Sequence, residues 1–80
     1  MERVSAWVIV CGTGALYPIG SGGGKAAYIH KEVAEDVMMA IADHDKAYVK
    51  GRGGLHLEEI TAEAGLFKQL GLNLVTQEKE

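Results

Sequence analysis

The glycine-rich stretch at residues 20–24, within IGSGGGKAA, is the feature that most restricts how this chain can fold. It separates a β-branched apolar segment from a segment whose apolar residues recur at helical spacing. Glycine adopts positive φ at no steric cost, so such a stretch marks a sharp change of direction. The sequence therefore predicts a strand region before residue 20 and a helical region after residue 24.

The segment before the glycines predicts a β-hairpin over residues 5–20. Ala6–Cys11, AWVIVC, is a continuous apolar run typical of a strand covered on both faces. The following GTG at 12–14 predicts a tight turn, and ALYPIG predicts the returning strand. Pro18 cannot donate a ladder hydrogen bond, so this return strand is expected to lie or end at a sheet edge.

The segment after the glycines predicts helix from Lys25 to about Asp45. Its apolar residues fall at helical spacing, with the acidic residues mostly on the other side. One long helix and two helices with a break near Glu35 fit this pattern equally well. The apolar positions are Ala26, Ile29, Val33, Val37 and Ile41.

The second half of the chain predicts a turn at 50–54, a strand at 54–60 and a short helix with the sequence AEAGLFKQL. Thr61 is the expected cap of that helix and Gly71 its C-terminal stop. LNLVTQ predicts a last strand, and residues 77–80 a solvated tail. Together these elements predict one α+β domain over residues 1–80.

Composition favours a protein with a partner. A chain of 80 residues buries only roughly 60% of the surface that its unfolded form exposes, yet 48% of its residues are hydrophobic. We therefore expect a homo-oligomer or a surface for another protein. The net charge of −3 and the lack of a basic cluster argue against nucleic acid as the partner.

Cysteine content and hydropathy predict a soluble cytoplasmic protein without a membrane partner. The single cysteine, Cys11, cannot form an internal disulfide and is expected to be an inert core thiol. The apolar run Ala6–Cys11 is far shorter than the roughly 20 residues that span a bilayer. Arg3 alone precedes it, which is not the basic leader of a signal peptide.

The glycine turn does not match a known nucleotide-binding pattern. A P-loop would need glycine at Ile19 and a hydroxyl residue at Ala26. The main expectation is thus a structural turn. The alternative is an anion site at the N-terminus of the predicted helix, formed by Gly20, Ser21, Gly22, Gly23, Gly24 and Lys25.

GALYPIGSGGGKAA, followed by MMAIADHDKAYVKGRGGLHLEEI, resembles the C-terminal half of proteasome-like N-terminal-nucleophile hydrolases of the HslV type and their phage relatives. The resemblance covers roughly residues 6–60. It implies that Ser21 and Asp45 support an active site. In that family the nucleophile is the first residue of the mature chain, whereas this chain begins Met-Glu. The resemblance therefore implies a half-fold without its own catalyst, and no cofactor is expected.

Other chemistry-bearing residues give weaker signals. His30, His44 and His56 match no metal-ligand spacing, so no metal site is predicted. Glu58, Glu59 and Glu63 form a carboxylate cluster to which the sequence assigns no function. Candidate interface residues are Trp7, Tyr17, Met38 and Met39.

Three functional classes follow from the sequence. The first is a non-catalytic protein-binding or self-assembling module, including a virus-encoded inhibitor of a host complex. The second is one chain of a split N-terminal-nucleophile hydrolase. The third is a small anion or nucleotide binder using residues 20–25. The first class requires only an apolar surface and is the preferred hypothesis.

Overall fold

The computed structural model describes residues 3–17 and 25–78, which form an α+β domain as predicted. One mixed sheet has the strand order β3-β1-β2-β4. β1 pairs antiparallel with β2 and β3, and β2 pairs parallel with β4. The elements are β1 (Arg3–Cys11), β2 (Lys25–Tyr28), α1 (Lys31–His44), α2 (Lys46–Gly51), β3 (Leu55–Glu63), α3 (Ala64–Gln69) and β4 (Leu72–Val75).

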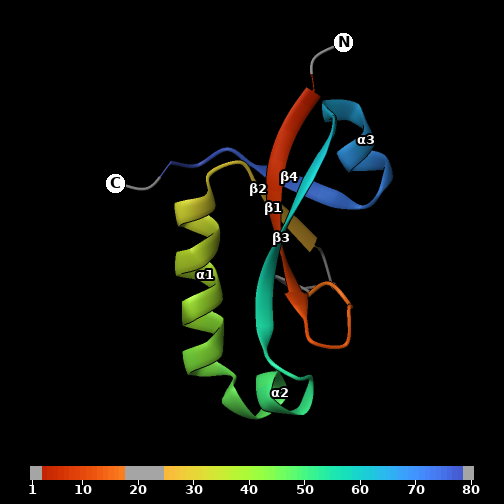
Figure 1. Ribbon diagram of the computed structural model, residues 1–80. Coiled ribbons are helices and arrows are strands. Elements are labelled where there is room, and N and C mark those ends of the chain that lie inside the picture. Colours follow the sequence, from red (N-terminus) through yellow and green to blue (C-terminus); the bar gives the residue numbers. More distant parts are fainter. Residues whose placement is uncertain (1–2, 18–24, 79–80) are drawn as a thin grey trace.

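Helices pack on both faces of this sheet (Figure 1). The long helix α1 lies along one face, and the short α3 lies on the opposite side near the start of β1. Alternate residues of β1 supply the two cores. Val8 and Val10 belong to the cluster with α3, whereas Ile9 belongs to the cluster with α1. The predicted strand covered on both faces is thus confirmed over Ala6–Cys11, and β1 extends back to Arg3.

The predicted turn at residues 12–14 is present. The amide of Gly14 donates to the carbonyl of Cys11 over 2.8 Å, and Gly14 has a φ of 92°. The returning segment is described only up to Tyr17. Within the described residues it consists of one bridge, between Val10 and Leu16, flanked by a hydrogen bond from the Tyr17 amide to the Ile9 carbonyl. Residues 18–20 of the predicted hairpin lie outside the described residues.

The prediction of a helix starting at Lys25 is wrong. Lys25–Tyr28 forms β2, and the helix begins at Lys31. β2 pairs along its whole length with β4, and Tyr28 pairs with Trp7 of β1. A segment of only four residues, KAAY, fits a strand as well as a helical turn, and here the pairing partners decide. Ala26 and Ile29 therefore precede the helix that they were expected to join.

The remainder of the predicted helix is one unbroken element. α1 runs from Lys31 to His44 without a break at Glu35, and Asp45 caps its C-terminus. Val33, Val37 and Ile41 pack against the sheet, as their helical spacing predicts. A second short helix, α2, follows at once and was not predicted as a helix.

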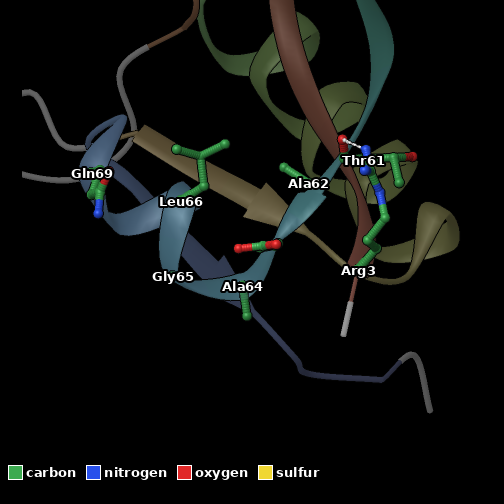
Figure 2. A pocket seen from close by; sticks show the side chains of 8 residues that line it. Arg3, Thr61, Ala62, Ala64, Gly65, Leu66 and Gln69 are labelled. Carbon is green, nitrogen blue, oxygen red and sulfur yellow. Dashed lines mark hydrogen bonds between the residues drawn. The ribbon is translucent and has the colours of Figure 1, made fainter. Parts of the chain in front are cut away.

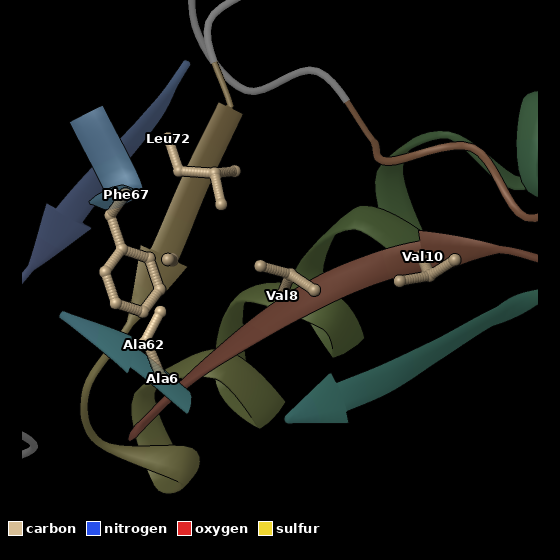
Figure 3. Packing of buried hydrophobic residues seen from close by; sticks show 7 residues of the cluster. Ala6, Val8, Val10, Ala62, Phe67 and Leu72 are labelled. Carbon is tan, nitrogen blue, oxygen red and sulfur yellow. The ribbon is translucent and has the colours of Figure 1, made fainter. Parts of the chain in front are cut away.

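The last three elements match the predicted order with one correction. β3 continues to Glu63, so Thr61 is a strand residue and not a helix cap. Thr61 pairs with Ser5 of β1, which keeps it in the sheet. Phe67 of α3 is fully buried between Leu72 and Ala62 (Figure 3). Gly71, with a φ of 80°, follows α3 as predicted.

Candidate partner-binding edge

The strand β3 forms one edge of the sheet. It is nine residues long and pairs with β1 from end to end on its inner side. The opposite edge strand, β4, has only four residues. Nine residues exceed the usual strand length of about five or six, and long edges are rare because they offer unpaired backbone groups to other chains.

The register shows which backbone groups of β3 point away from the sheet. In an antiparallel pair, hydrogen-bonded and non-hydrogen-bonded residue pairs alternate. The amide of Gly12 donates to the Gly54 carbonyl over 2.9 Å, which fixes the alternation for the register of β1 and β3. The groups that point outward consequently belong to Leu55, Leu57, Glu59, Thr61 and Glu63.

The far side of β1 supports this alternation independently. Cys11 and Ile9 pair with Leu55 and Leu57, respectively. The Cys11 amide and the Ile9 carbonyl bond to the returning segment after the turn, on the side of β1 away from β3. Their partners on β3 must likewise turn their backbone groups away from β1.

Most of these outward groups have no protein partner within residues 3–17 and 25–78. The exceptions are the carbonyl of Thr61, which accepts a hydrogen bond from the Arg3 guanidinium over 3.3 Å, and the carbonyl of Glu63, which as the N-cap residue of α3 accepts the first hydrogen bond of that helix. The amides and carbonyls of Leu57 and Glu59 point away from β1 along the middle of the edge and have no hydrogen-bond partner among the described residues. This arrangement can form backbone hydrogen bonds with one more strand.

The side chains along this edge are mainly acidic. Glu58, Glu59 and Glu63 are all exposed, and β3 contains neither lysine nor arginine. His56 and Glu58 share a hydrogen bond of 3.1 Å between Nε2 and Oε2. The carboxylate cluster noted in the sequence therefore lies on a single free sheet edge.

A partly apolar hollow of about 670 Å³ lies where β3 passes into α3. Figure 2 shows Leu66 and Gln69 on its α3 side and Arg3 with Thr61 on its strand side. Leu66 of α3 is 42% exposed, and Leu70, which directly follows this helix, is 58% exposed. The free edge thus ends beside exposed aliphatic surface.

The candidate anion site of the glycine turn falls almost entirely on residues that the structure does not describe. Gly20, Ser21, Gly22, Gly23 and Gly24 lie outside the described residues. Lys25 begins β2, so the helix N-terminus on which the anion alternative depended is not adjacent to the turn. The helix N-terminus therefore does not support the anion alternative, and anion binding by the turn itself stays a prediction.

Asp45 lies in a local cluster that holds the end of α1 against the hairpin. Its Oδ2 accepts a hydrogen bond from the Tyr17 hydroxyl over 2.9 Å. The Tyr17 ring meets the ring of Tyr48 edge-on, and Arg52 lies 4.7 Å from the centre of the Tyr48 ring. Asp45 therefore has a structural role, because it links the C-terminus of α1 to Tyr17. Its supporting role in an active site stays a prediction.

The four predicted interface residues separate into two groups. Trp7, Tyr17 and Met38 are partly buried and pack in the cluster between α1 and the sheet. Lys31 lies 4.8 Å from the centre of the Trp7 ring, which covers that ring further. Met39 is 68% exposed and is the member of the set best placed to meet another molecule.

We expect Tyr17 to ionise above the ordinary tyrosine pKa of 10.0. The hydrogen bond to Asp45 raises the pKa of Tyr17, and burial and the nearby carboxylate raise it further. The folded state then holds this proton more tightly than the unfolded state. The stability that the protonated Tyr17 hydroxyl contributes is fully present below pH 10 and is lost as the pH rises through the pKa of Tyr17 in the folded protein.

The measurement is a phenolate absorbance titration, taken as the difference between the protein and its Tyr17→Phe variant. Burial also raises the pKa of Tyr28, so the difference isolates Tyr17. Asp45→Asn should move the Tyr17 midpoint downward. An unchanged midpoint in Asp45→Asn would contradict the assigned contact.

Comparison with known proteins gives no family. No protein-family model matches the chain, and no curated protein or solved structure does so either. The resemblance to N-terminal-nucleophile hydrolases therefore stays a prediction. Within the described residues, no helix has the length and apolar character needed to cross a membrane.

Proposed function

We propose that this chain is a non-catalytic protein-binding module that receives an extended segment of another protein along the outer edge of β3. The observation that carries the proposal is the length of that edge together with its unpaired backbone groups. Added strands gain affinity from main-chain hydrogen bonds and specificity from side-chain contacts on alternate residues.

The hollow beside α3 supports the same function. Its exposed apolar lining offers a place for a side chain of the added segment at the end where Leu66 lies. A binding role of this kind also agrees with the large apolar fraction of so short a chain. It requires no nucleophile.

The test is selection from a library of random nine-residue peptides, followed by affinity measurement on two variants. Glu59→Pro removes an outward amide and places a ring on the edge, whereas Glu59→Ala removes the side chain and keeps the amide. Each lost hydrogen bond weakens binding by about 2- to 13-fold, corresponding to about 0.5–1.5 kcal/mol. We expect selected peptides to lose affinity for Glu59→Pro beyond any loss for Glu59→Ala.

Equal affinity for the two variants would place the peptide elsewhere and overturn the proposal. Both variants must first show the circular dichroism and cooperative melting of the parent protein, so that lost binding is not lost folding.

A further inference from the structure

We infer that the segment received by β3 belongs to a different protein and carries lysine or arginine at two positions four residues apart, with apolar residues between them on the opposite face. This inference rests on the proposed function, because it specifies the partner of that same edge.

Two glutamates on the α1 face of the sheet determine where the partner segment carries its basic residues. Glu59 and Glu63 lie on this face because strand residues alternate between the two sides. They are four residues apart, with Thr61 between them. Directly opposite side chains on neighbouring strands interact, and opposite charges stabilise the pair. A partner therefore places its basic residues across from Glu59 and Glu63.

The apolar residues of β3 on the α3 face of the sheet determine where the partner segment carries its apolar residues. Ile60 and Ala62 belong to the cluster with α3, and Ala62 also lines the hollow beside Leu66. A residue opposite Ala62 would enter an apolar surrounding. The fitting pattern is consequently basic, apolar, any residue, apolar, basic.

A second copy of this chain fits the edge poorly. The antiparallel register that pairs all nine residues of two β3 strands sets Glu59 directly opposite its own copy. Centring the pair on Glu58 instead sets Glu58 opposite itself. Like charges directly opposite each other destabilise a strand pair, and β3 itself contributes glutamates from both chains and contains no lysine or arginine.

Arg3 is the cation on the edge that a partner would meet. Its guanidinium occupies the outward carbonyl of Thr61. A partner amide can replace this hydrogen bond, which would release Arg3 from the edge. Lys31 is a further cation on this face, and it lies over the ring of Trp7, which pairs with Glu59 across the strands.

The probe is an acetylated and amidated peptide, Thr-Val-Lys-Val-Thr-Val-Lys-Val-Thr. Its sequence is the same in both directions, so it presents the required pattern whether it adds parallel or antiparallel. The matched control peptide has glutamate in place of both lysines. Binding is followed by calorimetry and by the amide chemical shifts of Leu57, Glu59 and Thr61.

We expect the lysine peptide to bind more tightly than the glutamate peptide and to shift the outward amides of β3. One exposed ion pair contributes about 1.4- to 5-fold in affinity, so two contribute roughly 2- to 25-fold. The Glu59→Gln, Glu63→Gln double variant should lose this advantage. The Glu32→Gln, Glu35→Gln double variant, which changes the same net charge on exposed α1 positions, should keep it.

Three outcomes would overturn the inference. Equal affinity for the two peptides with shifted edge amides would remove the charge preference and leave the proposed function standing. Failure of both peptides, while library-selected peptides still bind the edge, would also reject only the inferred pattern. A protein that is dimeric without peptide, with protected Leu57 and Glu59 amides, would make a second copy the occupant.

Discussion

Replacing Phe67 with alanine is expected to remove a large part of the stability of this protein. Phe67 is 0% exposed and packs against residues from β1, β2, β3 and β4. Truncating a buried phenylalanine costs about 3–5 kcal/mol. A domain of this size has a free energy of unfolding of roughly 4–12 kcal/mol, so the variant approaches or crosses the limit of folding.

The measurement is the urea unfolding midpoint of Phe67→Ala beside that of Leu70→Ala. Leu70 follows the same short helix but is 58% exposed, so its truncation should change stability by only about 0.5 kcal/mol. Similar midpoints for the two variants would show that α3 does not seal the core as described.

Proline is expected to destabilise the fold strongly at Glu58 but to be tolerated at the adjacent Glu59 of β3. Glu58 faces inward in the ladder, so Glu58→Pro removes the amide that bonds to β1 at Val8. An unsatisfied carbonyl costs about 1–3 kcal/mol, before the clash of the ring with β1 is counted. Glu59→Pro removes an amide that faces solvent, a position at which edge strands tolerate proline.

The two variants lose the same net charge and differ by one position, and Glu58→Pro additionally loses the exposed contact between Glu58 and His56, which contributes little. Thermal melts should show a markedly lower melting temperature for Glu58→Pro than for Glu59→Pro. The reverse order would mean that the register of β1 and β3 is shifted by one residue.

Local patterns in the sequence predicted much of this fold. The β-branched run AWVIVC, the glycines of the first turn and the helical spacing of Val33, Val37 and Ile41 each indicate their element without knowledge of its neighbours. β2 was missed for the converse reason. KAAY has no strong preference of its own, and its pairing with β1 and β4 decides its conformation.

The candidate binding edge could be predicted only in part. Glu58, Glu59 and Glu63 were visible as a carboxylate cluster, and the strand at 54–60 was predicted. Strand order depends on pairing between residues far apart in the chain, such as Arg3 with Glu63. The sequence pattern therefore did not indicate that this strand lies at an edge or which of its backbone groups point outward.

The central claim is that β3 offers a free edge to another strand, and amide hydrogen exchange of the unliganded protein tests it most directly. Outward amides should exchange rapidly at Leu57 and Glu59, whereas the inward amides of Glu58 and Ile60 should be protected by the ladder with β1. We predict this alternation along the middle of β3. Strong protection at all four amides would show that the edge is already paired, and would contradict the account.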